Sequence, residues 1–417
     1  MADPHSHSHE TPINEPNYGA VTRVATMSLV VGGVVFGSCA ALQGSLREVL
    51  LSYLAGYVFW LDVVLGAFSL SMLAYLTTAS WGLIQRRIFQ AIMRTWWLFA
   101  LLFLPILASL FISGGEYSPF WWTIPTAEYT DVPTSMIEID HKKHDWLNPK
   151  FFAIRAVIYF VVFGGYMALL ARAARKSEDQ NDAKATGMLR VISGPGVVLW
   201  ALLVTFLTTD WVMSVEPTWA STMFPVIFAV NGFLTAHAFG VFTFYSLNKG
   251  NKAFMDVYVK DKFRLDMGTL LLGFAMVWSY ASFCQFMLIW AGNLPEEITY
   301  FLKRGGNDDF GWRIMCYLLI FFHWMTPFVV LLFKEVKLHP NRMRAMCAML
   351  LLVCMVDVIW WIVPAFEHKG TLHVPMAFGA LAMVGGIFGI AFAAQLKKRG
   401  ILPPEEAKFL SEWGNHH

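Results

Sequence analysis

The residues of this sequence that could do chemistry are ionisable side chains embedded in long apolar stretches. A charged side chain at the centre of a bilayer costs at least about 2.5–3.5 kcal/mol, so each such residue is a functional hypothesis by default. Acids and histidines in series can pass protons, while an arginine or carboxylate can hold a polar ligand or form an internal ion pair. The six candidates are Asp62, Arg155, Asp210, His237, His323 and Asp357.

The depths of these residues predict a proton path. With a rise of 1.5 Å per residue, Asp357 should lie roughly 10 Å below the outer end of its helix, His323 about 17 Å and His237 about 24 Å. Asp62 falls near mid-depth. We therefore predict a proton-conducting series of His237, His323, Asp357 and Asp62.

A structural interpretation of the same residues stays open. Asp210 can pair with Arg155 and Asp357 with Arg313, and a buried neutral histidine can bond to a backbone carbonyl. In that interpretation the polar groups join helices and move no protons.

No motif in the sequence indicates a bound redox group or covalent catalysis. The five cysteines form no C-x-x-C, and the sequence has no P-loop, no G-x-G-x-x-G after a strand and no H-E-x-x-H. A haem held by two histidines needs them at matching depth, whereas His237 and His323 differ by roughly 7 Å. We expect no cofactor bound covalently or by metal ligation, and no catalytic residue, in this chain.

The elements that must position these residues are membrane-spanning helices. Charged residues make up 14% and apolar residues 57% of the 417 residues, against roughly 25% charged in soluble proteins. A span needs about 20 apolar residues. An all-α polytopic membrane protein follows, and nothing predicts binding to nucleic acid. The ten predicted spans are approximately 22–42, 49–77, 93–113, 151–172, 190–214, 221–247, 268–292, 312–333, 342–364 and 372–396.

The distribution of Lys and Arg predicts the orientation. Most of the 31 basic residues lie in the linkers after the second, fourth, sixth and eighth spans and in the C-terminal tail. Short cytoplasmic loops carry such an excess. Both termini are therefore predicted in the cytoplasm, and the loops 114–150, 293–311 and 364–371 are predicted to face outward.

A spacing that recurs four helices apart predicts an internal duplication. In each half an Arg-x-x-x-Tyr enters from outside, and an Asp precedes a Pro by seven residues as a helix leaves. The matching positions are Arg155 and Tyr159 with Arg313 and Tyr317, and Asp210 and Pro217 with Asp357 and Pro364. Two four-helix bundles follow, helices 2–5 over about 49–214 and helices 6–9 over about 221–364. Helices 1 and 10 flank them in one domain of 21–396, between a disordered tail of 1–20 and a cytoplasmic tail of 397–417.

Two stretches are similar to a known family. They are Asp210 to Phe224 (DWVMSVEPTWASTMF) and Trp290 to Ile298 (WAGNLPEEI). Over its ten-helix span the chain resembles the second of the two NrfD/PsrC-like membrane subunits of alternative complex III, a bacterial quinol:cytochrome c oxidoreductase. The architecture of that family, two four-helix bundles with two flanking helices, agrees with the duplication.

The resemblance implies partners and a function. The expected partners are a multihaem cytochrome c subunit, an iron–sulfur subunit, a second NrfD-like subunit, small membrane or haem subunits, lipids and the menaquinone or other quinone pool. Haem and iron–sulfur clusters would reside in those partners. The chain would then be a multi-pass subunit of the bacterial cytoplasmic membrane, without its own redox centre, in a respiratory or photosynthetic electron-transport complex. It would scaffold the periplasmic redox subunits.

Two roles remain open for the polar residues under this resemblance. Besides the proton path, Asp62, Arg155 and Asp210 lie at a suitable depth for a quinone headgroup, or else form an internal salt-bridge cluster. A stand-alone secondary transporter is the alternative from another class. Against it, the repeat is parallel and no Gly/Pro-interrupted helix pair occupies corresponding positions of the two halves.

Overall fold

A computed structural model describes residues 18–401 except positions 44, 78–79, 124–144, 181–182, 217–218, 252–254, 256–258, 307–309 and 366–371. Over these residues the chain is helical and contains no strand. The predicted tails lie largely outside the described residues, although the first helix already begins at Tyr18. The prediction of an all-helical fold is confirmed.

The described residues form nine single helices that could cross a membrane, and a tenth span if one bent helix pair is counted. The spans are α1 (Tyr18–Gln43), α2 (Leu46–Thr77), α3 with α4 (Ser80–Met93 and Trp96–Ser109), α6 (Pro149–Gln180), α7 (Ala183–Trp211), α8 (Phe224–Leu247), α10 (Asp261–Gly292), α12 to α13 (Phe310–Leu318, Leu319–Met325 and Thr326–Leu332), α15 (Pro340–Ile362) and α16 (His373–Lys397). The short helices α11 (Pro295–Phe301) and α14 (Lys334–Leu338) lie between spans.

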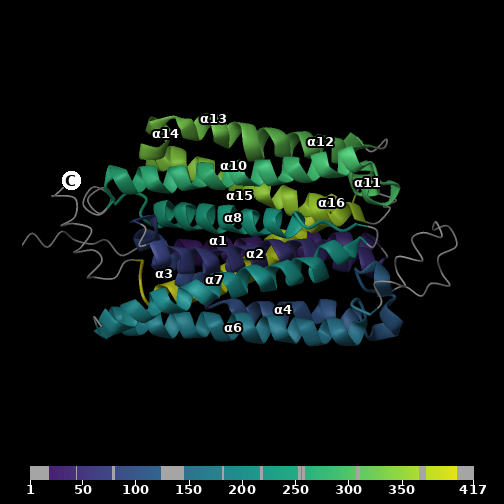
Figure 1. Ribbon diagram of the computed structural model, residues 1–417, viewed down its shortest axis with the longest axis horizontal. Helices are drawn as coiled ribbons and strands as arrows, with labels where there is room; N and C mark the ends of the chain where they lie inside the picture. The colour runs from purple at the N-terminus through teal and green to yellow at the C-terminus, as the bar shows by residue number, and fades with distance from the viewer. Residues whose placement is uncertain are drawn as a thin grey trace, which may run out of the picture.

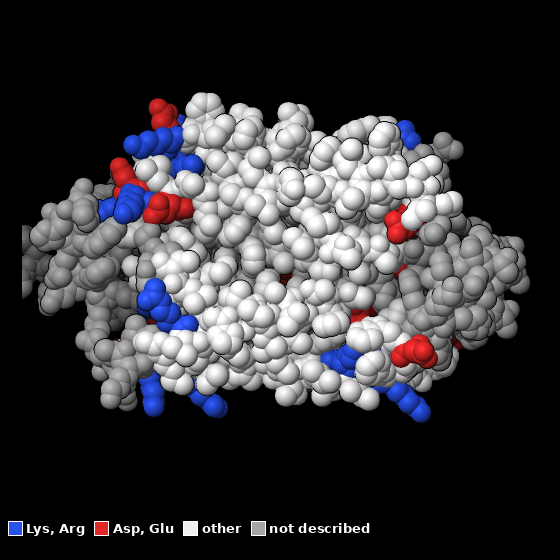
Figure 2. Space-filling view, in the orientation of Figure 1, with Lys and Arg blue, Asp and Glu red and all other residues white. Residues whose placement is uncertain are grey.

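The spans lie side by side along one axis (Figure 1), with α11 on the right and the C-terminus of the chain, which follows the last residues of α16, on the left. Charged side chains gather at these two ends, and a broad uncharged band separates them on the face that Figure 2 shows. Such a band matches the hydrocarbon core of a bilayer, which disfavours charge. The protein is a multi-pass integral membrane protein. Below, the end at which α16 finishes is called the C-terminal end, and the opposite end is called the α11 end.

The third span differs from the prediction of a single helix over 93–113. It begins earlier, in α3, and bends by 42° where α3 meets α4. At the bend the Thr95 hydroxyl donates to the carbonyl of Ile92 at 2.7 Å, and Pro105 lies within α4. The polar residues of α3, Gln85 and Arg87 among them, lower its hydropathy, which is why a search for apolar windows missed it.

The spans form two four-membered rings. In the first bundle α2, α4, α6 and α7 each contact the next, and in the second α8, α10, α13 with its preceding turns, and α15 do the same. The first bundle occupies the lower part of Figure 1 and most of the second the upper part. Helices α2 and α8 form the seam between the bundles and are the most enclosed spans, since 83% and 72% of their apolar windows are buried.

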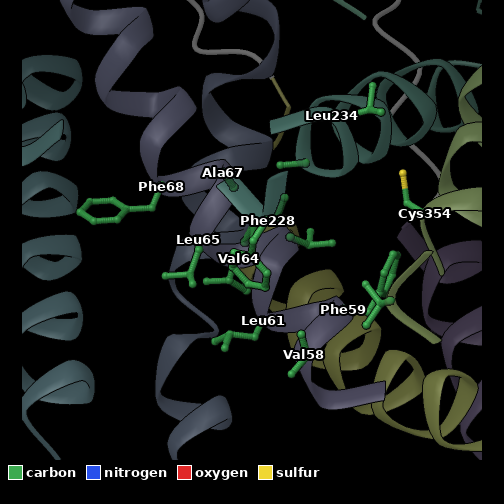
Figure 3. Packing of buried hydrophobic residues seen from close by; sticks show 14 of the residues in the cluster. Val58, Phe59, Leu61, Val64, Leu65, Ala67, Phe68, Phe228, Leu234 and Cys354 are labelled. Atoms are coloured by element: carbon green, nitrogen blue, oxygen red, sulfur yellow. The ribbon is translucent and has the colours of Figure 1, made fainter. Parts of the chain in front are cut away.

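Glycines allow α2 and α8 to approach each other at the seam until their backbones touch. A methyl group added to Gly66 on α2 would lie 2.0 Å from the carbonyl oxygen of Gly232 on α8. Val64 of α2 and Phe228 of α8 belong to the same apolar cluster, while Phe68 points away toward another helix (Figure 3), where it meets Phe163 of α6 edge to face. The first bundle and the seam therefore share one continuous apolar core.

The two flanking helices pack on each other and then on α2. Ser28 of α1 donates to the carbonyl of Ala382 on α16 at 2.8 Å. Trp60 of α2 donates to the carbonyl of Leu381 at 2.8 Å. Helix α16 therefore lies between α1 and the seam, and α1 has one of the most exposed apolar surfaces of the spans.

Candidate functional site

The strongest candidate site is a buried pair of titratable side chains in the second bundle. His323 lies in the segment Leu319–Met325, and Asp357 lies on α15. The His323 Nδ1 is 3.6 Å from the Asp357 Oδ2, and both side chains are almost fully buried. The indole of Trp278 stacks on the imidazole at 3.6 Å and donates to the same Oδ2 at 3.0 Å. Trp278 thereby fixes both partners.

A π-helical stretch brings His323 to this position. The seven residues Leu319–Met325 are π-helical rather than α-helical, and Pro327 follows near the start of α13. Proline has no N–H, so the carbonyl of His323 loses its ordinary α-helical donor four residues later. Short π-helical segments occur frequently at functional sites.

The ring nitrogens of His323 are not both satisfied. Its Nε2 lies 3.5 Å from the Cys354 Sγ, whereas its Nδ1 makes no hydrogen bond within the described structure. The 3.6 Å separation from Asp357 exceeds hydrogen-bond distance by a few tenths of an ångström. A small movement or a bridging water would therefore connect the imidazole and the carboxyl.

Asp357 does not form the predicted pair with Arg313. The Arg313 Nε donates to the carbonyl of Gly305 at 3.1 Å, and the only basic side chain within ion-pair distance of Asp357 among the described residues is His323. The duplicated sequence spacing therefore does not produce a duplicated ion pair, because Arg313 binds a linker carbonyl and His323 takes the place beside Asp357.

Asp62 extends this group across the seam. Its Oδ2 accepts a hydrogen bond from the Asn231 amide at 3.0 Å, and its Oδ1 lies where a Cβ on Gly232 would be only 2.3 Å away. The carboxyl is close enough to Asp357 and Cys354 for electrostatic interaction. Three of the four residues predicted for the proton path therefore interact, His323 and Asp357 at 3.6 Å and Asp62 with Asp357 through electrostatics. We call Asp62, His323, Cys354 and Asp357 the seam cluster.

His237 belongs to a different environment. One ring nitrogen lies 3.0 Å from the carbonyl of Met267 and the other 3.1 Å from the Gln85 amide. As placed, the Gln85 Nε2 has no hydrogen-bond partner within the described structure. Turning the amide by 180° points this nitrogen at the ring. A neutral His237 then donates to the Met267 carbonyl and accepts from Gln85. No hydrogen bond in the described part of the chain joins it to the seam cluster.

The side chains of Asp357 and His323 meet at 3.6 Å, although their predicted depths differ by roughly 7 Å. Depths counted from helix ends assume straight α-helices of equal reach. The π-helical stretch and the separate ends of α12 and α15 break that assumption.

In the first bundle, Asp210 and Arg155 form the expected ion pair. Two nitrogens of Arg155 donate to the two carboxylate oxygens at 2.7 and 2.9 Å. Tyr159 and Trp146 donate to the same carboxylate at 2.6 and 2.9 Å. Asp62 lies in the seam cluster instead, so the three residues proposed for a quinone headgroup do not form one group. The Asp210 carboxylate has its acceptor positions occupied by protein donors.

Sequence reasoning missed a second ion pair, at the α11 end of the second bundle. The fully buried Arg304 donates to Glu216 at 2.9 Å and to the carbonyls of Trp360 and Trp361 at 2.8 and 2.7 Å. Its guanidinium lies 3.5 Å from the ring centroid of Tyr300, and burial raises the pKa of this phenol. Lys303 also contacts Glu216, at 3.1 Å.

A sequence signal for this second pair existed but was weak. Glu216 lies in the stretch of resemblance, whereas Lys303 and Arg304 precede two glycines and look like an ordinary polar linker. Nothing local indicates that the Arg304 side chain is buried.

The described residues contain no group of three or more His, Cys, Asp or Glu that could hold a metal ion. No protein-family model matches the sequence, and no curated protein matches it at a significant level. The chemistry that the seam cluster can perform is to accept, share and release protons.

Proposed function

We propose that this protein is a membrane subunit of a quinol-oxidising electron-transport complex of the alternative complex III type. In this proposal its seam cluster holds and transfers protons. The observation that carries the proposal is the buried His323–Asp357 pair, 3.6 Å apart with no lysine or arginine in ion-pair contact among the described residues.

One proton shared by this pair keeps the site neutral. The proton can reside on the Asp357 carboxyl with a neutral imidazole, or on the imidazole with a carboxylate. In both forms the net charge is zero, so moving the proton avoids the large cost of an isolated buried charge. The Trp278 indole donates to the carboxyl in either form, and Asp62 offers a second carboxyl across the seam.

The α11 end supports the scaffolding part of the proposal. Two buried ion pairs, Arg155 with Asp210 and Arg304 with Glu216, brace this end of both bundles. By the positive-inside rule this end faces the periplasm, where redox partner subunits would dock. Rigid backbone there would hold such partners at fixed distances.

The test uses the purified assembly reconstituted in liposomes, with an Asp357→Asn, His323→Ala variant beside wild type. Quinol oxidation and internal pH are recorded together. We expect oxidation to persist while proton movement across the membrane falls. An Asp261→Asn variant at an exposed carboxyl (70% exposed side chain) is the control and should behave as wild type.

Three results would overturn parts of this proposal. Unchanged proton movement in the variant would make the seam cluster structural. Purification of the chain alone in mild detergent, without haem-containing partners, would favour the stand-alone transporter instead. Collapse of oxidation in an assembled complex would replace the proton path by a quinone site.

A further inference from the structure

A cluster of arginines at the C-terminal end has far more positive than negative charge among the described residues. Arg87 of α3 and Arg399, just after α16, both bind the Oε2 of Glu178 at the end of α6, at 3.4 and 3.2 Å. Gln90 donates to the other oxygen of this carboxylate at 3.0 Å. Arg87 also donates to the backbone carbonyl of Arg399. Three spans that are distant in sequence are thereby joined around a single carboxylate.

Two further arginines, Arg94 and Arg175, belong to this cluster. Arg94 lies at the bend between α3 and α4, and it interacts electrostatically with Arg87, Arg175, Arg399 and Glu178. The described part of the cluster thus holds four guanidinium groups and one carboxylate, so positive charge dominates it. Exposed Lys397 and Lys398 add to the positive potential beside them.

The cluster has donors that no described protein group uses. The Nη2 of Arg94 and the Nε of Arg87 are buried and make no hydrogen bond within the described structure. The side chain of Glu178 is only 6% exposed and that of Arg87 11%, so water screens these charges poorly. Buried cations that outnumber their counter-charges are costly, and an anion with several acceptor oxygens would compensate the excess.

We propose that Arg87, Arg94, Arg175 and Arg399 form a binding site for a phosphate group, supplied by the headgroup of an anionic lipid. Guanidinium groups match phosphate oxygens in pairs of hydrogen bonds. The surroundings favour a lipid over a free ion, because helix α4, which follows the bend at Arg94, presents exposed apolar side chains, Trp97, Leu101 and Leu104. Acyl chains could lie on that surface, and basic pockets between spans at such an end typically bind anionic headgroups.

The experiment measures the rise in melting temperature of the full-length protein in neutral detergent as lipid is added. The probes are cardiolipin, phosphatidylglycerol, phosphatidylcholine and inorganic phosphate. We expect the two anionic lipids to stabilise the wild type at the lowest concentrations and phosphatidylcholine to have no effect. A basic residue near an anionic headgroup is worth about a fivefold change in affinity, so Arg94→Gln with Arg399→Gln should weaken the response about twenty- to thirtyfold.

Two variants make the result decisive. Arg342→Gln removes an exposed arginine of the same end, 56% exposed, and should leave the lipid response unchanged. Glu178→Gln removes the carboxylate at the centre of the cluster, so it should destabilise the lipid-free protein yet strengthen its response to lipid. That opposite sign keeps the proposal testable even if the double arginine variant does not fold.

The outcomes separate the sources of the phosphate. Equal stabilisation of wild type by inorganic phosphate, lost in the double variant, would assign the site to a soluble anion and overturn the lipid source. The same lipid response in wild type, the double arginine variant and Glu178→Gln would overturn the site altogether.

Discussion

The two bundles place an aspartate at corresponding positions and surround it differently. In the first bundle Asp210 accepts hydrogen bonds from Arg155, Tyr159 and Trp146. Its carboxylate therefore has a permanently positive partner in Arg155. In the second bundle Asp357 instead contacts Trp278, Trp361 and His323. Arginine does not release its proton in a protein, whereas histidine does.

Under the proposed function, this difference separates bracing from proton transfer. A carboxylate paired with arginine stays charged and holds α6 against α7. A carboxyl beside a histidine can exchange its proton without creating net charge. The duplicated framework therefore places an aspartate in each bundle and pairs one with arginine and the other with histidine.

The largest effect should come from breaking the first pair. Arg155→Met leaves the Asp210 carboxylate buried without a cation, and loss of one partner of a buried pair costs about 3–5 kcal/mol. Thermal unfolding in detergent, followed by tryptophan fluorescence, measures it. The double variant Arg155→Met, Asp210→Leu should recover much of the loss; a single variant as stable as wild type would refute the bracing role.

A smaller loss is expected at the ion pair of the second bundle. Glu216→Gln removes the carboxylate partner of Arg304, but the guanidinium retains the carbonyls of Tyr300, Trp360 and Trp361. We expect a destabilisation of about 2 kcal/mol, typical of a lost charged hydrogen bond. Glu335→Gln, at an 87% exposed side chain, is the control and should change nothing measurable.

The most direct comparison of the two bundles makes the same substitution at each aspartate. Asp357→Asn should cost about 1 kcal/mol or less, because the amide can still accept from Trp278 and no arginine loses its partner. Asp210→Asn should cost several times more in the same unfolding assay. Equal losses for the two variants would mean that Asp357 is a charged structural group.

The smallest effect on stability is expected from making the titratable pair apolar. His323→Phe with Asp357→Leu replaces buried polar groups by side chains that can pack, and such exchanges are often neutral or stabilising. We expect the free energy of unfolding to stay within about 1 kcal/mol of wild type while proton movement in liposomes is lost. A severe loss of stability would show that the pair mainly supports the fold.

Hydropathy and the repeated spacing predicted the spans and one of the ion pairs, but not the contacts that depend on irregular backbone. Continuous apolar runs located nine spans closely, and the polar face of α3, with Gln85 and Arg87, concealed part of the third. The Arg155–Asp210 pair was predictable because both residues lie near the same end of adjacent helices. The same reasoning predicted an ion pair between Arg313 and Asp357, and that prediction was wrong.

The failure has a specific physical cause. A helical period of 3.6 residues says nothing about a π-helical stretch, so the approach of His323 to Asp357 could not be derived. The burial of Arg304 likewise depends on the fold of a linker whose polar residues carry no periodic signal. Which of the four candidates share a site was therefore beyond the sequence.

The contact between Gly66 and Gly232 limits how this protein can move. Carriers that alternate access rock one half of the molecule against the other, and such rocking needs a seam that can open or slide. Here backbone touches backbone at the seam, with no room for even a methyl group, and the core is continuous across it. Rocking of one half against the other would first have to separate this contact, so the packing disfavours a carrier that works by rocking.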